Sequence, residues 1–216
     1  MSMVTDLLLQ AVLILVSLFM FLALHNIPQK LYAKFRYRDR AQVQSKRHFV
    51  LGAQHLARAR SAKSRSDSSS FAKDALAEAE KAIALDPKDA AAHILKALVF
   101  DLQGFKTSAL ESLDAALSPL AVKSLSEKER GDAFFKRAEL KMAMARRGKV
   151  DSVITDLDEA VKLSPDNAKA FCLLGECYEV KKMEEEARKA YEDALKVEPE
   201  LAVAQQGLDR LTSSTI

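Results

Sequence analysis

The sequence predicts an all-α protein built as a stack of antiparallel helix pairs and preceded by one transmembrane helix. The composition favours helix over strand, because only 6 Gly and 5 Pro occur among 216 residues and Ala, Leu, Lys and Glu are abundant. Helical phrases ending in proline recur with a period of 34 residues. Residues 7–24 form a long apolar run near the N-terminus.

The apolar run contains 18 residues, of which 16 are apolar and none is charged. As a helix it would span about 27 Å, close to a hydrocarbon core of about 30 Å. A cleaved signal peptide is the competing interpretation, but residues 1–6 hold no basic residue and no clear cleavage site follows the run. We therefore predict a short tail at 1–6 and a retained single-pass anchor at 7–24.

The segment after this run, residues 25–45, is rich in basic residues. Residues 25–70 hold eleven Lys or Arg against two Asp, whereas residues 71–216 carry a net negative charge. The positive-inside rule then predicts a cytosolic C-terminal domain and an N-terminus across the membrane. An N-terminal anchor with a basic flank resembles receptor and assembly proteins of the mitochondrial or plastid outer membrane, and the apolar run could equally enter the endoplasmic reticulum. Interleaved aromatic residues also suit nucleic acid, but beside an apolar run anionic lipid is the favoured partner. The residues predicted to contact lipid headgroups are Lys30, Lys34, Arg36, Arg38 and Arg40.

The repeat is most distinct near the C-terminus, where Pro165 and Pro199 lie 34 residues apart in similar phrases. Small and aromatic residues alternate there at fixed intervals: Phe171, Leu174, Gly175, Tyr178, Ala187, Tyr191 and Ala194. This pattern resembles the tetratricopeptide repeat family, with Phe171 in place of the usual Trp. The resemblance implies a right-handed superhelical solenoid in which the small residues lie at the closest helix contacts.

The same pattern predicts the order of repeats along the chain. A degenerate first repeat includes a Ser-rich segment, 61–70, which we expect to be a flexible loop open to phosphorylation. Three further repeats follow, with a linker between the second and third repeats, and a last helix covers the end of the stack. The predicted ranges are 46–89, 90–117, the linker 118–130, 131–167, 168–201 and the capping helix 202–212.

The resemblance implies that a partner binds along the face formed by the first helix of each repeat. This surface is apolar in the second repeat and mixed in charge further on, which suits an extended or helical peptide. For Leu95 and Leu98 the alternative, that they face the packed interior, remains open. The residues predicted to line the groove are Ile94, Leu95, Leu98, Leu102, Phe135, Lys136, Glu139, Lys169, Leu173 and Glu176.

Some family members bind the acidic tails of heat-shock chaperones through a clamp of Lys, Asn and Arg side chains. At the corresponding positions this sequence has Phe49, Ala53, Leu95 and Asp132, and only Lys136 is basic. Holding carboxylates requires matched donors, so we expect the clamp to be absent. A co-chaperone role nevertheless stays among the alternatives.

These observations predict an adaptor or scaffold protein that binds another protein, and not an enzyme. No Gly-rich phosphate loop, nucleophile motif or metal-ligand spacing occurs, so we expect no cofactor and no metal. Cys172 and Cys177 lie five positions apart, about 140° around a helix, and are expected to be unpaired apolar residues. The alternative function is tethering of RNA or anionic lipid through residues 25–70.

Overall fold

A computed structural model describes the backbone of residues 2–24, 27–145 and 150–213, and the side chains of 7–21, 40–145 and 150–213. The chain forms two compact units, Met1–Gln44 and Ser45–Ile216. Helix is the regular secondary structure throughout these described ranges, in agreement with the predicted all-α class. In chain order the elements are α1 (Ser2–Leu24), α2 (Ile27–Ser61), α3 (Arg65–Leu85), α4 (Ala90–Leu102), α5 (Lys106–Ala116), the 3₁₀ helix η1 (Val122–Ser124), α6 (Glu127–Met144), α7 (Asp151–Leu163), α8 (Ala168–Val180), α9 (Glu184–Val197) and α10 (Ala202–Ser213).

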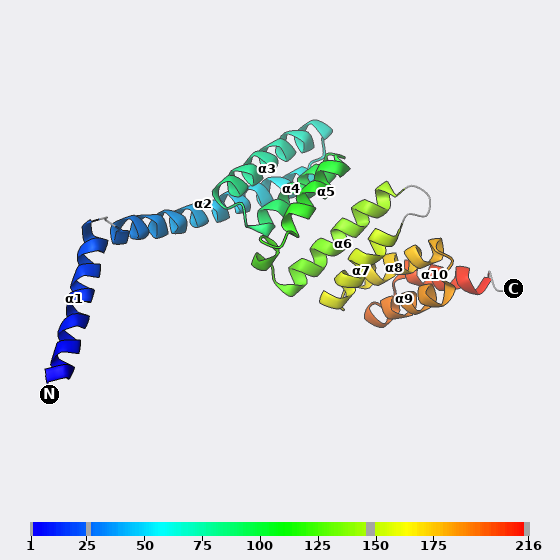
Figure 1. Ribbon diagram of the computed structural model, residues 1–216. Coiled ribbons are helices and arrows are strands. Elements are labelled where there is room, and N and C mark those ends of the chain that lie inside the picture. Colours follow the sequence, from blue (N-terminus) through cyan, green and yellow to red (C-terminus); the bar gives the residue numbers. More distant parts are fainter. Residues whose placement is uncertain (1, 25–26, 146–149, 214–216) are drawn as a thin grey trace. The chain divides into compact units, whose positions relative to one another are not determined.

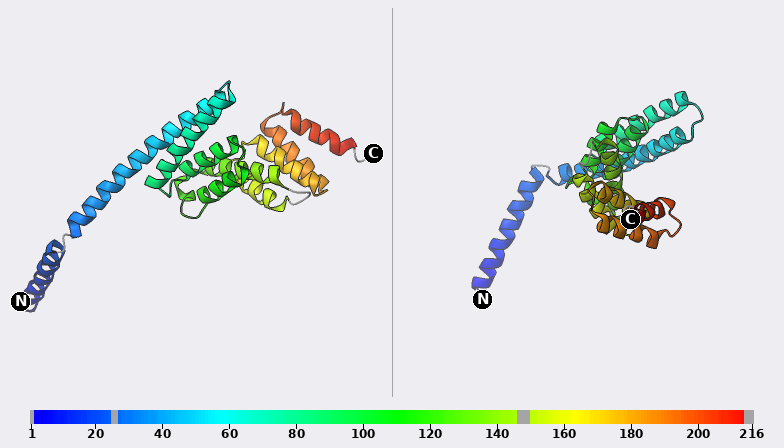
Figure 2. Two further views of the ribbon diagram at one scale, coloured as in Figure 1. Left: turned by 90° about the horizontal axis from the view of Figure 1, so that it is seen from above. Right: turned by 90° about the vertical axis from the view of Figure 1, so that its right-hand side faces the viewer.

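The second unit is a solenoid of helix pairs. Helix α4 packs on α5, α6 on α7 and α8 on α9, and each pair also contacts the next along the chain (Figure 1). The left view of Figure 2 shows the same succession of pairs from above. Alanine dominates the contacts between helices. Of the described residues from α3 to α9, twelve alanines are fully buried: Ala75, Ala79, Ala82, Ala90, Ala92, Ala109, Ala116, Ala138, Ala160, Ala170, Ala187 and Ala194.

The predicted membrane anchor is not supported. None of the helices in the described residues combines the length and the apolar character that crossing a membrane requires. This contradicts the transmembrane helix predicted at 7–24, the single-pass topology and the membrane localisation.

The predicted lipid-headgroup contacts depended on that anchor and lose their support with it. Of the five residues, Arg40 is described and exposed. The side chains of Lys30, Lys34, Arg36 and Arg38 lie outside the described residues. The backbone of this segment belongs to α2, which continues without interruption to Ser61.

The Ser-rich segment differs from the predicted loop over 61–70, because only residues 62–64 lie between α2 and α3. Ser64 is the N-cap of α3, and its hydroxyl accepts hydrogen bonds from the backbone N–H groups of Ser66 and Asp67 at 3.1 and 3.4 Å. Ser68 donates its hydroxyl proton to the carbonyl of Ala59 on α2 at 2.8 Å. The serines therefore start a helix and tie it to α2.

The linker predicted at 118–130 is also shorter than expected. It contains η1, and α6 begins at Glu127. A capping box starts this helix: the Ser126 hydroxyl accepts from the Glu129 N–H at 3.3 Å, and the Glu129 carboxylate accepts from the Ser126 N–H at 2.8 Å. The first helix of this repeat is therefore one turn longer than the sequence pattern indicated.

Candidate partner-binding groove

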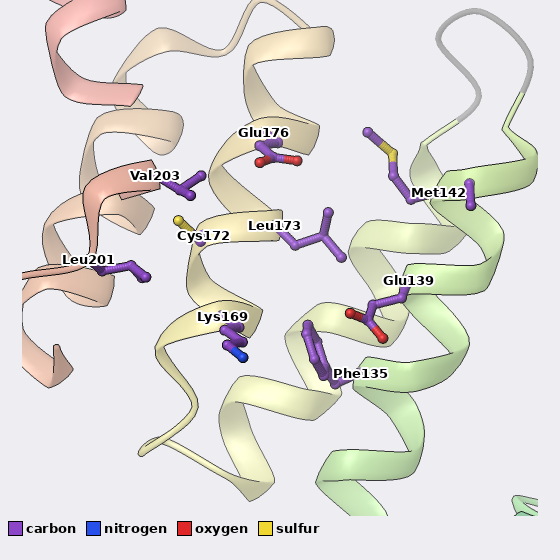
Figure 3. Close-up of a pocket in the computed structure, with 10 residues that line it drawn as sticks. Phe135, Glu139, Met142, Lys169, Cys172, Leu173, Glu176, Leu201 and Val203 are labelled. Carbon is purple, nitrogen blue, oxygen red and sulfur yellow. The ribbon is translucent and has the colours of Figure 1, made fainter. Parts of the chain in front are cut away.

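The first helices of successive pairs line two adjoining pockets of the solenoid. The first pocket, of about 660 Å³, lies between α2, α4 and α6. The second, of about 480 Å³, lies between α6, α8 and the start of α10 (Figure 3). Because Phe135, Glu139 and Lys169 line both pockets, the two form one continuous groove.

The structure brings nine of the ten predicted groove residues to this groove. They are Ile94, Leu95, Leu98, Phe135, Lys136, Glu139, Lys169, Leu173 and Glu176. Leu102 does not line it, although its side chain is 39% exposed. Whether these nine side chains bind a partner stays a prediction.

Leu95 differs from the other lining residues in its burial. Its side chain is 3% exposed and belongs to the core that joins α2, α3 and α4. Leu98, one turn later, is only partly buried against the same core. Leu95 is therefore mainly a core residue, in agreement with the alternative that its side chain faces the packed interior.

The prediction missed the parts of the groove that come from α2 and from the start of α10. Helix α2 places apolar residues along one face, with spacings of four and three residues. Leu201 and Val203 close the second pocket at the other end. The sequence did contain a signal for the α2 wall: Phe49 and Ala53 lie four residues apart and therefore share one face of a helix. The α2 residues lining the first pocket are Phe49, Ala53, Leu56, Ala57 and Arg60.

Lys136 is held within the groove by two carboxylates. Its ammonium lies 2.8 Å from Asp101 Oδ2 and 3.2 Å from Glu139 Oε2. Burial disfavours the charged form, but the hydrogen bond with Asp101 and the charge of Glu139 outweigh burial and raise the pKa of Lys136. The side chain therefore stays charged and already has its partners.

The residues predicted at the positions of a chaperone-tail clamp line the first pocket. Phe49, Ala53, Leu95 and Asp132, which the resemblance places at those positions, offer no cationic donor there. Lys136 is the remaining basic residue of that set, and Asp101 and Glu139 already bind it. An incoming acidic tail would therefore meet Lys136 with its charge already paired, and the carboxylate of Asp132 would repel it.

The two cysteines are buried free thiols. Cys172 lines the second pocket and Cys177 lies in the core between α7, α8 and α9. Burial raises the pKa of both thiols to about 11. Both remain protonated at neutral pH, so neither is a nucleophile there.

A groove along stacked antiparallel helix pairs defines a helical-repeat protein of the solenoid class. A model of the tetratricopeptide repeat family matches residues 56–121 and 143–202, more than half of the sequence. The chain belongs to the tetratricopeptide repeat family. No curated protein matches it.

Solved structures share this fold at low sequence identity. MamA from Desulfovibrio magneticus RS-1 is 16% identical, with a TM-score of 0.62 over 80% of this chain and 85% of that one. YrrB, described as a tetratricopeptide protein with an unusual peptide-binding site, is 20% identical, with a TM-score of 0.55 over 68% and 71%. The first repeat domain of Spaghetti, bound to an HSP90 peptide, is 21% identical, with a TM-score of 0.50 over 60% and 95%.

Proposed function

We propose that this protein is a non-catalytic adaptor that binds a segment of another protein in the groove along α2, α4, α6 and α8. The observation that carries the proposal is the continuous groove itself, with partly buried apolar side chains such as Ile94, Leu98 and Leu173 on its walls. Covering such side chains contributes roughly 25 cal/mol per Å² of apolar surface. Binding of peptides by YrrB and by the Spaghetti domain supports the same use of the fold.

The co-chaperone alternative has less support. The Spaghetti domain is bound to an HSP90 peptide, but this groove lacks the donors for an acidic tail. Asp132 lies exposed on its wall, and Asp101 and Glu139 occupy Lys136. The adaptor we propose therefore binds a different kind of segment.

Site-specific photo-crosslinking tests the adaptor function without destabilising the core. A benzophenone side chain replaces Ile94 or Leu173 in the full chain, and crosslinked peptides are identified by mass spectrometry. Leu102 is the matched control, because it lies on the same helix as Ile94 but outside the groove. Leu95 is unsuitable, since it is 3% exposed and a change there perturbs folding.

The expected result is crosslinking of one common partner peptide at both groove positions and not at position 102. Equal crosslinking at all three positions would mean that the partner lies elsewhere on the solenoid. Absence of any crosslinked protein at the groove positions, with the chain correctly folded by circular dichroism, would contradict the adaptor function.

A further inference from the structure

Glu176 is an unusual residue of the second pocket, because its carboxylate is taken partly out of water without an ion pair among the described residues. Its side chain is half-buried and lies with Leu173, Met142 and Val203 around the pocket (Figure 3). Burial raises the pKa of Glu176, an effect that the charge of Arg210 only partly offsets. A carboxylate in this position is stabilised by any cation that enters the pocket.

The cation that acts on Glu176 from within the protein is already engaged. Arg210 Nη2 lies 2.8 Å from Glu179 Oε2, and the same nitrogen lies 3.4 Å from Tyr191 Oη. Glu179 is thereby neutralised, whereas Glu176 has no ion pair with another described residue. The charge of α10 therefore compensates the negative charge of Glu176 only in part.

Glu139 adds to this charge from α6, on the facing side of the second pocket. Its carboxylate shares Lys136 with Asp101, so that one cation serves two carboxylates. Figure 3 shows Glu139 and Glu176 on the two walls with Leu173 between them. Lys169 is exposed and lies seven residues before Glu176 on α8, about 10 Å away along the axis. It forms no ion pair with either glutamate.

Resting on the proposed function, we propose that the partner segment is cationic and places a Lys or Arg side chain between Glu139 and Glu176. The aliphatic stem of that side chain packs on Leu173 and Met142, and its charged end binds the two carboxylates. An apolar residue of the same segment packs beside Phe135, where the two pockets join. An acidic segment would instead bring a third carboxylate into this pocket.

Selection of binding peptides is the test. The full chain is presented with a library of random twelve-residue peptides, and the same selection is run on Leu173→Arg, which blocks the pocket and repels cations, to identify sequences that depend on the groove. We expect groove-dependent peptides to be enriched in Lys or Arg next to a large apolar residue, and depleted in Asp and Glu. Enrichment of acidic or uncharged peptides would overturn the cationic partner while leaving the adaptor function intact. Failure to find any groove-dependent peptide would overturn both.

The role of Glu176 is tested on the enriched cationic peptide. Glu176→Gln keeps the side-chain shape, and we expect it to weaken binding about tenfold, the loss of one charge-assisted hydrogen bond. Glu192→Gln is the matched control, because Glu192 is exposed on α9 and lies outside the groove. Added salt should weaken binding to the wild type more than to Glu176→Gln. Equal affinity of both variants for the peptide would show that the cation binds elsewhere.

Discussion

The ring of Tyr191 on α9 fills the space that Gly175 leaves open on α8. A Cβ atom at Gly175 would lie 2.7 Å from Tyr191 Cε1, closer than atoms of this kind approach. Gly207 on α10 makes the same room on the other side, where a Cβ would lie 2.5 Å from Cζ of the same ring. Tyr191 is completely buried, so these contacts hold three helices together.

We expect Gly175→Ala to lower the free energy of unfolding by about 1–3 kcal/mol, because the added methyl group overpacks the contact with Tyr191. The gain from replacing Gly by Ala in a helix, about 1 kcal/mol, offsets only part of this cost. Urea unfolding followed by circular dichroism measures the change. The same substitution in a Tyr191→Leu background is the control, and it should cost less because the ring is gone. Equal costs in both backgrounds would contradict the contact as the cause.

The hydroxyl of Tyr191 makes a separate contribution. It donates a hydrogen bond to Glu179 Oε2 at 2.8 Å, so Tyr191→Phe should lower the free energy of unfolding by about 0.5–1.5 kcal/mol. Tyr178→Phe on α8 is the matched control, since the partly buried Tyr178 has no such hydrogen bond among the described contacts. Thermal unfolding of both variants compares the two. An equal loss of stability in both variants would show that removing any partly buried tyrosine hydroxyl has this effect, and that the hydrogen bond to Glu179 is not its cause.

The sequence predicted the helix pairs and most of the groove because both depend on short-range spacing. Ile94 and Leu98 lie four residues apart and therefore share a face, as do Leu173 and Glu176, which lie three apart. Leu95 was harder to place, since it is rotated about 100° from Ile94. Its burial depends on Gly52 of α2, where a Cβ would lie 2.8 Å from Leu95 Cδ2. Such a contact between distant segments is not visible in the spacing of one helix.

The remaining errors have similar physical causes. A run of serines indicates a loop by composition, yet Ser64 and Asp67 have the spacing of a helix N-terminus. Val203 was assigned only to the capping helix and Leu201 only to the end of the last repeat, although a helix that covers the end of a solenoid also faces the last groove position. In both cases the structure depends on a tertiary contact that the local sequence pattern does not show.

Asp156 on α7 joins two cations of α6 in the interior. Its side chain is 3% exposed and lies 2.6 Å from Arg137 Nη2 and 2.7 Å from Lys141 Nζ. Asp156→Ala leaves both cations without this partner and should lower the free energy of unfolding by about 3 kcal/mol. Asp114→Ala is the control: Asp114 binds the same Arg137 at 2.8 Å but is 63% exposed, and we expect its loss to cost about 1 kcal/mol or less. Urea unfolding measures the loss of unfolding free energy in both variants. Equal losses would contradict the role of burial.

Glu179 makes stability depend on pH in the acid range. Burial alone would raise the pKa of Glu179, but the hydrogen bonds from Arg210 and Tyr191 outweigh burial and lower it below the ordinary value of 4.5. Because the folded-state pKa lies below the unfolded one, the stabilisation is complete above pH 4.5 and is lost as the pH falls through the lowered value. Glu179→Gln should therefore be less stable than the wild type at neutral pH, with the difference shrinking as acid is added.

The measurement is the midpoint of thermal unfolding of both proteins from neutral to acid pH. Glu192→Gln is the control, because its exposed carboxylate lies on α9 without an ion pair to any described residue, and its curve should follow that of the wild type. Parallel curves for the wild type and Glu179→Gln would contradict the coupling. A convergence of those two curves below pH 4.5 would identify the Glu179 carboxylate as the group whose protonation loosens the contact of α8 with α9 and α10.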